Sequence, residues 1–370
     1  MLKQSHRESI APRPALASLR LIGEKRIRVP NKPDFYLVTP RMPLQEPGMS
    51  NEITELTSQA EELGFDRVWI IETNDRDAFA VATEMALASK RITIGTNIVS
   101  VFTRTPTLLA MGAFTLDEIS NGRFILGIGP GGTEIVRDGH GVPFSKPLTR
   151  VKESIEVIRA LLPGDRVTYQ GTQFTIKDGF RLRAGARDPH LPIYISALNP
   201  KMLELAGESA DGVILSHAPI EAVASIRERV SEGAGRVSRD PSDIEICINL
   251  PVGVDEPEGT LSLRKAVAWH LAAPTYDWLV SHTRYADRVA EIRSLWWSGE
   301  AGERETAAAL VDDEMLLTFG LGYTDEMIKT RIDAYLEEGI TPIIDSHGIR
   351  KQYEKEDTLR IMKAAIQGRG

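Results

Sequence analysis

Residues 122–132 read GRFILGIGPGG, an apolar run followed by a glycine-rich turn. The run from Phe124 to Ile128 predicts a strand, and the turn has the spacing G-x-G-x-x-G of a dinucleotide-binding loop. Such a loop must open a helix and be followed about 20 residues later by an acid at a strand end. No good helix is expected directly after Gly132, and Glu153 falls inside a predicted amphipathic helix. A dinucleotide-binding fold is therefore not favoured, and the turn is interpreted as a loop after a strand of another α/β fold.

The surrounding sequence alternates short β-branched runs with longer amphipathic segments, a pattern typical of parallel strands joined by helices. A hairpin insertion is predicted around Val167 and Phe174. Helices are predicted over residues 51–63, 77–89, 106–119, 149–162, 200–208 and 219–232. Strands are predicted within 35–39, 67–72, 91–100, 124–128, 192–196, 212–216, 244–250 and 340–345. Eight strands in this order predict an α/β fold of the (β/α)8 TIM-barrel type, whose active site lies on the loops after the strands.

Three regions are expected along the chain. Residues 1–33 are predicted to be an irregular N-terminal arm, and residues 34–366 a barrel. A helical insertion near strand seven is predicted over about residues 255–323, and it holds four of the five tryptophans. This insertion is interpreted as an apolar subdomain or subunit interface, or else as a wall of the substrate pocket.

Composition excludes several classes of function. The formal net charge is −8 and no extended block of Lys and Arg occurs, so nucleic acid is not an expected partner. No apolar run approaches the roughly 18 residues of a membrane-spanning helix, and no secretory signal is recognised. The single cysteine, Cys247, forms no internal disulfide, which fits a cytoplasmic protein. The scattered histidines provide no metal-ligand spacing, so no metal is expected.

Several segments together resemble the luciferase-like superfamily of flavin and deazaflavin oxidoreductases. The segments are Thr103-Arg104-Thr105-Pro106, residues 115–123, the GIGPGG turn, residues 192–204, residues 206–213 and residues 310–315. Within the superfamily, the sequence is most similar to coenzyme F420-dependent methylenetetrahydromethanopterin reductases. The resemblance covers roughly residues 34–366 and implies a homodimer that transfers a hydride between a cofactor and a small organic substrate.

The resemblance also implies a cofactor site. In the F420 branch a non-prolyl cis peptide at the end of strand three forms a bulge behind the deazaflavin ring, and the matching bond is Ser100-Val101. Thr103 matches a ring or ribityl contact, and the backbone of Ala197, Leu198 and Asn199 matches a phosphate cradle. The glycines of the strand-four turn, Gly129 and Gly131, would let the backbone approach a planar ligand closely.

The sequence departs from the methylenetetrahydromethanopterin reductases at three places. Strand one, residues 35–39, lacks their carboxylate, and Gly132 stands where they have an aspartate. Their common Asp-His pair after strand two is replaced by Glu72-Thr73. We therefore expect a retained cofactor site and a different substrate.

Several residues beyond strand ends qualify as catalytic candidates by position, and Glu72, Glu134 and His217 are the three we select. Glu72 follows strand two, Glu134 follows the glycine turn and could donate a proton if its loop turns inward, and His217 could donate to a developing anion. Asp345 with His347 also qualifies by position. Each has a plainer interpretation, such as a solvated loop carboxylate for Glu134 or a loop-bonding histidine for His217.

Two further functions stay open at this point. One is an FMN-dependent monooxygenase of the same superfamily, which uses reduced flavin and oxygen. The other is a non-catalytic flavin-binding barrel that has lost its acids.

Overall fold

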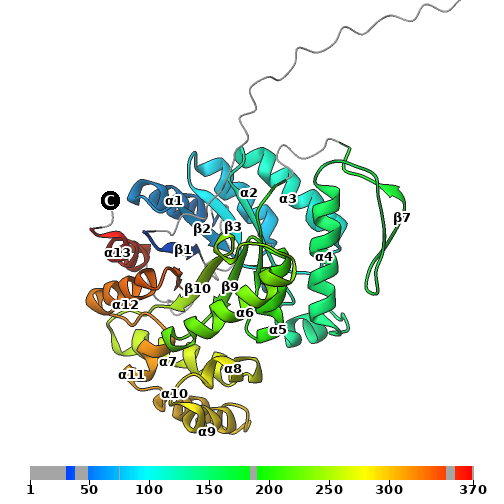
Figure 1. Cartoon of the computed structure of the whole chain (residues 1–370). Coiled ribbons are helices and arrows are strands. Elements are labelled where there is room, and N and C mark those ends of the chain that lie inside the picture. The colour runs from blue at the N-terminus through cyan, green and yellow to red at the C-terminus, as the bar shows by residue number, and fades with distance from the viewer. Residues whose placement is uncertain (1–30, 38–48, 75, 184–189, 347–354, 369–370) are drawn as a thin grey trace, which may run out of the picture.

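The computed structural model describes residues 31–37, 49–74, 76–183, 190–346 and 355–368. Its centre is a parallel barrel surrounded by helices (Figure 1). The barrel strands are β1 (Asp34–Leu37), β2 (Arg67–Ile70), β3 (Thr93–Thr96) with β4 (Val99–Ser100), β5 (Phe124–Gly129), β8 (Ile193–Ser196), β9 (Gly212–Ser216), β10 (Glu245–Pro251) and β11 (Thr341–Asp345). This confirms the predicted (β/α)8 barrel, whose eight positions follow the sequence order.

The barrel closes through parallel pairs between every neighbouring strand. Tyr36 of β1 pairs with Asp345 of β11 on one side and with Trp69 of β2 on the other. The third position is shared by two short pieces, because β3 pairs with the start of β5 and β4 pairs with its end. The strand at this third position is therefore interrupted between Thr96 and Val99, at the carboxyl end of the barrel.

Helices pack around the outside of this barrel and bury their apolar faces against it (Figure 1). Between successive strands lie α1 (Met49–Leu63), α2 (Ala78–Ala88), α3 (Pro106–Ser120), α4 (Pro147–Leu161), α5 (Pro200–Ser209), α6 (Val223–Arg236) and α12 (Asp325–Glu337), and α13 (Lys355–Ile366) follows β11. Several have the caps that their sequences predict. Thr105 caps α3 ahead of Pro106, and Asn121 ends it in the left-handed conformation.

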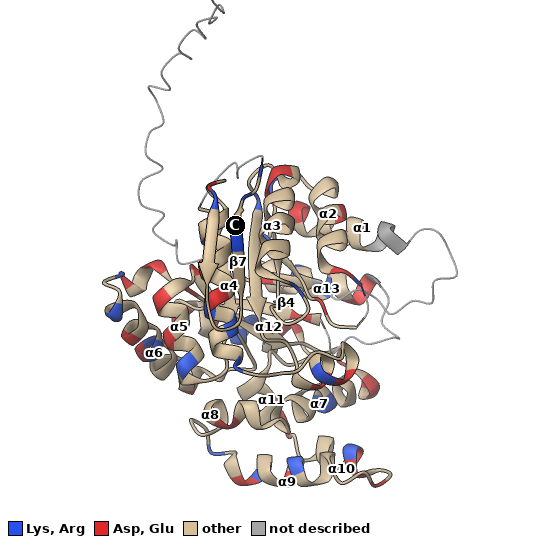
Figure 2. Ribbon diagram, turned by 90° about the vertical axis from the view of Figure 1, so that its right-hand side faces the viewer, with Lys and Arg blue, Asp and Glu red and all other residues tan. Residues whose placement is uncertain are grey.

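Two segments lie outside the repeating pattern. The hairpin of β6 (Val167–Gln170) and β7 (Thr175–Phe180) stands beside α4 at the edge of the molecule (Figure 1), as predicted. Between β10 and α12 the chain forms α7 (Pro257–Leu271), α8 (Asp277–Val280), α9 (Ala286–Trp296), α10 (Glu303–Ala309) and α11 (Asp313–Phe319). Both basic and acidic residues lie on outer helices such as α6, α9 and α10 (Figure 2).

The amino ends of the strands hold a buried charged cluster. Arg67 donates to Glu245 at 2.7 Å and to Asp34 at 3.1 Å, and Trp69 Nε1 donates to Asp34 at 2.9 Å. Thr341 and the Tyr194 hydroxyl donate to Glu245, both at 2.6 Å. Because this cluster lies at the end opposite the loops that follow the strands, it contributes to stability rather than to a site.

In the described ranges, every helix is too short or too polar to cross a bilayer. Most of the predicted N-terminal arm, the end of predicted strand one beyond Leu37, and His347 lie outside the described residues.

Candidate functional site

The residues predicted to hold a cofactor meet at the carboxyl ends of three neighbouring barrel positions. Ser100 of β4 pairs with Gly129 of β5, and the Val101 amide donates to the Gly129 carbonyl at 2.9 Å. Ser100 Oγ donates to the Pro130 carbonyl at 2.8 Å, and Thr103 Oγ1 donates to the Ser100 carbonyl at 3.3 Å. The turn after β4 and the glycine turn after β5 are thus joined directly.

The predicted position of the cis peptide was wrong. The non-prolyl cis bond joins Asn97 to Ile98, and the bond between Ser100 and Val101 is not cis. The sequence pattern had predicted one continuous strand over residues 91–100 and so placed the irregularity after it. The structure interrupts that strand at Thr96, and Ser100 and Val101 are still engaged in pairing with β5.

Gly129 and Gly131 leave room at this junction. A Cβ atom on Gly129 would lie 2.1 Å from Ser196 Oγ of β8, and one on Gly131, whose φ is +76°, would lie 3.3 Å from Ser100. Any larger residue would therefore fill the space where the ends of β4, β5 and β8 converge.

The chain beyond β8 supplies the opening of a helix. Ala197 donates its amide to the Ile214 carbonyl at 3.0 Å, Leu198 is half-buried, and the exposed Asn199 caps α5 by accepting the Met202 amide at 3.2 Å. The first turn of a helix presents free amide hydrogens and the positive end of its dipole, which favours a phosphate. Because the Ala197 amide is already bonded to the Ile214 carbonyl, the phosphate of a flavin or deazaflavin cofactor fits the amides of Leu198 and Asn199 instead.

Sequence analysis missed a polar layer beneath these turns. Asn249 of β10 bonds to the Asn97 side chain at 2.8 Å and to Ser216 Oγ at 3.3 Å, and both asparagines are buried. The available signal was a polar residue in the buried run of residues 244–250. Alternation along a strand sends Cys247 and Asn249 to the same side, toward the barrel interior.

His217 lies directly after β9 in the left-handed conformation, with its amide donating to the Asn249 carbonyl at 2.9 Å. Its side chain is fully buried, and its ring stacks on His270 of α7 with centroids 3.9 Å apart. The Tyr276 ring meets His217 edge-on at 5.9 Å. The segment after β10 thus covers His217, so a substrate reaches this imidazole only if α7 moves.

Glu72 is held by an arginine. Arg104 donates to its two carboxylate oxygens at 3.0 and 2.6 Å, and the Ala78 amide donates to it at 3.2 Å. The carboxylates of Glu72 and Asp77 raise the pKa of Arg104 further above its usual value. Glu72 therefore ties the end of β2 to the starts of α2 and α3, and both of its carboxylate oxygens are engaged by Arg104.

Glu134 is exposed and lies just before a π-helical turn, Ile135–Gly139. We expected no good helix after the glycines, and the structure has only this one short turn there, within which Asp138 pairs with Arg137. Among the catalytic candidates Glu72, Glu134 and His217, only Glu134 has an exposed side chain.

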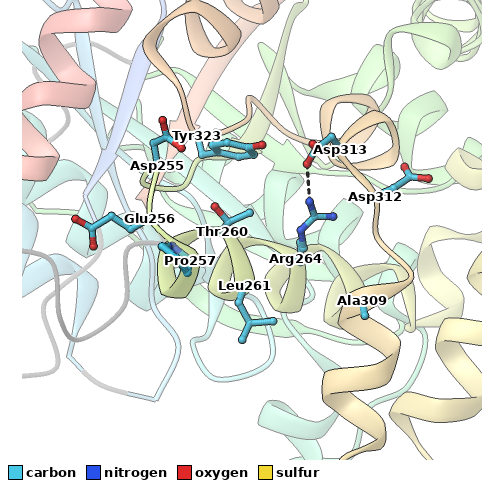
Figure 3. A pocket seen from close by; sticks show the side chains of 10 residues that line it. All are labelled: Asp255, Glu256, Pro257, Thr260, Leu261, Arg264, Ala309, Asp312, Asp313 and Tyr323. Carbon is cyan, nitrogen blue, oxygen red and sulfur yellow. Dashed lines mark hydrogen bonds and ion pairs between the residues drawn. The ribbon is translucent and has the colours of Figure 1, made fainter.

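A cavity of about 760 Å³ lies elsewhere (Figure 3). It opens between the start of α7 and the segment around α11. Arg264 points to Asp313 across it, and the lining also contains Asp255, Glu256 and Asp312. Four carboxylates against one arginine disfavour a phosphate-bearing ligand, so this cavity does not replace the site at Ser100 and Asn199.

No group of three or more His, Cys, Asp or Glu side chains within the described ranges is arranged to hold a metal ion.

A closed (β/α)8 barrel with its polar groups and glycine turns at the carboxyl ends of the strands defines the class of TIM-barrel enzymes. Residues 35–342 match the model of the luciferase-like monooxygenase family, and the chain belongs to that family. It is 32% identical to a 5,10-methylenetetrahydromethanopterin reductase of Methanolobus tindarius, over 82% of this chain and 92% of the relative.

Two solved structures share the fold. The coenzyme F420-dependent tetrahydromethanopterin reductase of Methanopyrus kandleri superposes with a TM-score of 0.77 at 24% identity, covering 91% of this chain and 97% of that one. An F420-dependent secondary alcohol dehydrogenase superposes with a TM-score of 0.70 at 22% identity, covering 90% and 98%. These relatives and structural neighbours are enzymes, and F420-dependent oxidoreductases are among them.

Proposed function

We propose that this protein is a coenzyme F420-dependent oxidoreductase that transfers a hydride between the deazaflavin and a small organic substrate. The observation that carries the proposal is the convergence of Ser100, Gly129 and the start of α5 on neighbouring strand ends. A planar ring would lie against the first two, and its phosphate at the amide groups of Leu198 and Asn199, since the Ala197 amide is bonded to Ile214. Family membership and the F420-dependent relatives support the same assignment.

The residues of this chain bind the cofactor and orient it toward the substrate. When bound, the coenzyme would donate a hydride from its ring carbon C5 in the reduced form, or accept one there in the oxidised form. The Ser100 to Thr103 turn and the glycine turn fix the plane of the ring, and the first turn of α5 holds the phosphate. Most of the rate then comes from keeping the donor and acceptor carbons about 3 to 3.5 Å apart. Where the reaction needs a proton, the exposed Glu134 is the group we assign to supply it.

The proposed substrate differs from methylenetetrahydromethanopterin. Gly132 has no carboxyl group, and Glu72, at the position of the reductases' Asp-His pair, is bound to Arg104. Relatives with about a third of their residues identical carry the reductase name, so this part of the proposal needs its own test. Efficient turnover of the pterin by the purified protein would overturn it.

The second candidate is an FMN-dependent monooxygenase, which the description of the matching family favours. Separate titrations with F420 and with FMN, followed by fluorescence, distinguish the two. We expect saturable binding of F420. Tight binding of FMN without binding of F420 would reverse the assignment.

A non-catalytic flavin-binding barrel predicts a different result. Such a protein binds the cofactor, but no member of a panel of ketones, imines and activated alkenes oxidises reduced F420 in its presence. The Ser100→Phe substitution further distinguishes an enzyme from a non-catalytic barrel. An enzyme loses turnover, whereas a scaffold keeps its contacts with a partner.

The proposal includes a homodimer. The large apolar side chains Leu87 of α2 and Leu108, Met111 and Ile119 of α3 are exposed on neighbouring helices, which is the kind of face that a second copy covers. Light scattering after size exclusion tests this, and a monomer at all concentrations would contradict it. A cytoplasmic location is also proposed, because the one cysteine, Cys247, is buried and forms no disulfide.

A further inference from the structure

The hairpin of β6 and β7 is connected to the candidate cofactor site through one arginine. Arg150 of α4 donates its Nε hydrogen to the Val101 carbonyl at 2.9 Å. Its guanidinium carbon lies 4.8 Å from the ring centre of Phe102 and 4.8 Å from that of Phe174, at the tip of the hairpin. One side chain therefore contacts the turn after β4 and the hairpin at the same time.

The hairpin tip is itself fixed by the next turn of the same helix. Glu153 is buried, and its carboxylate accepts the amide hydrogens of residues 172, 173 and 174 at 2.7, 2.9 and 3.0 Å, with the Thr172 hydroxyl at 2.8 Å. These bonds hold the pKa of Glu153 below its usual value, despite the opposing effect of burial. Phe174 is thereby placed against Arg150.

Val101 is held from two sides. Its amide donates to Gly129, and its carbonyl accepts from Arg150. Phe102 is fixed as well, because its ring stacks on Phe144 with centroids 4.6 Å apart and its amide donates to Ser100 Oγ at 3.1 Å. Without Arg150, the Val101 carbonyl would lose a charged donor while the remaining bonds persist.

We propose that Arg150 is a positioning residue that fixes the Ser100 to Thr103 turn, and that the β6–β7 hairpin serves to hold Arg150 in place. The proposal rests on the proposed function in one respect only, namely that this turn carries the cofactor ring. Arg150 itself touches no cofactor in this scheme, and it acts through the Val101 carbonyl.

The experiment compares two arginines of the same helix in the full chain. Arg150→Met keeps the apolar stem and removes the donor. Arg159→Met is the matched control, because Arg159 also donates to a carbonyl, that of Leu191, and to Asp211, but at the amino ends of the strands. Phe174→Ala removes the hairpin contact independently and tests the same proposal if Arg150→Met does not fold.

Hydrogen exchange of the peptide covering residues 99–104 is the first measurement. We expect Arg150→Met, and to a smaller extent Phe174→Ala, to speed exchange in this peptide, whereas Arg159→Met does not. Binding of F420 should weaken by up to about tenfold in Arg150→Met, because the turn must then be ordered on binding at a cost of at most the one charged hydrogen bond that was lost. It should stay unchanged in Arg159→Met.

Unaltered exchange in residues 99–104 of folded Arg150→Met would overturn the proposal, as would equal effects of the two arginine substitutions. Failure of the proposed function gives a different result. In that case the unsubstituted protein does not bind F420, while the exchange comparison still decides whether Arg150 fixes the turn.

Discussion

The side-chain amides of Asn97 and Asn249 bond to each other in both directions, at 2.8 and 3.2 Å, across the interior of the barrel. Asn97 directly follows β3, and Asn249 lies in β10, the fourth strand position away in either direction around the barrel. The pair therefore joins opposite walls and lies beneath the turns that carry the candidate site. Because both side chains are buried, each amide relies on the other for a hydrogen-bond partner.

Asn249→Leu should destabilise the protein, because it leaves the buried Asn97 amide without this partner. We expect a loss of about 1 to 3 kcal/mol in the free energy of unfolding. The double variant Asn97→Leu with Asn249→Leu should lose less free energy of unfolding than the two single variants lose together, because both polar groups are then removed. A double-mutant cycle by urea unfolding measures this coupling, and strictly additive losses would contradict it.

The charged cluster at the amino ends of the strands predicts a pH dependence of stability. Arg67 donates hydrogen bonds to two buried carboxyl groups, those of Asp34 and Glu245. Burial raises the pKa of Asp34 to about 6, whereas Arg67, Thr341 and Tyr194 lower the pKa of Glu245 to about 2 despite its burial. Asp34 thus keeps its proton in the folded protein until about pH 6.

The sign follows from which state binds more protons. The folded state holds a proton on Asp34 between the ordinary pKa of 3.8 and about 6, so this group makes stability fall as the pH rises through that range. Glu245 contributes stability above its ordinary pKa of 4.5 that is lost as the pH falls toward 2.

Asp34→Asn should remove the decline between about pH 4 and pH 6, because an amide does not ionise. Urea unfolding at pH 5 and pH 7 measures the difference for the variant and for the unsubstituted protein. An unchanged slope in Asp34→Asn would show that Asp34 is already ionised at pH 5 in the folded protein.

Two glycines of β5 predict different outcomes for the same substitution. A Cβ on Gly127 would lie 1.8 Å from the Thr96 carbonyl oxygen, so Gly127→Ala must displace the backbone of β3 and should prevent stable folding. A Cβ on Gly129 would meet Ser196 Oγ, which can rotate away, so Gly129→Ala should fold but bind F420 more weakly. Adding Ser196→Gly should restore part of the binding. Thermal unfolding and F420 titration test both, and unchanged F420 binding by Gly129→Ala would contradict the assignment of the site.

Glu134→Gln tests the proposed proton donor. We expect a slower turnover number with an unchanged dissociation constant for F420, because the carboxyl acts on the substrate and not on the cofactor. Asp138→Asn is the matched control, since Asp138 is exposed on the same turn but pairs with Arg137. Oxidation of reduced F420 by the best acceptor of the panel is the assay. Equal rates for Glu134→Gln and the unsubstituted protein would exclude Glu134 from catalysis.

Much of the fold was predictable because its signals are local. The β-branched runs, the cap at Thr105 with Pro106, and the stop at Asn121-Gly122 each define an element from neighbouring residues. The turn at Gly131 could be placed at a strand end for the same reason. The break in strand three could not, because residues 91–100 have the composition of one continuous strand, and only pairing with β5 shows where it stops.

The candidate site was less predictable because it depends on contacts between distant residues. Asn97 and Asn249 are 152 positions apart, and Arg150 acts on a carbonyl 49 positions away. His217 has a sequence position suited to catalysis, yet α7 covers it with His270. Glu72 likewise follows a strand end, but its carboxylate is bound by Arg104. Position along the chain predicted which loops lie at the carboxyl ends of the strands, and packing determined which of their side chains remain accessible.

The most direct test of the central claim is a crystal structure of the protein with bound F420. We expect the deazaflavin ring against the Ser100 to Thr103 turn and Gly129, with its phosphate at the amide groups of Leu198 and Asn199. A ring bound in the acidic cavity beside Arg264, or a phosphate held away from the start of α5, would contradict it.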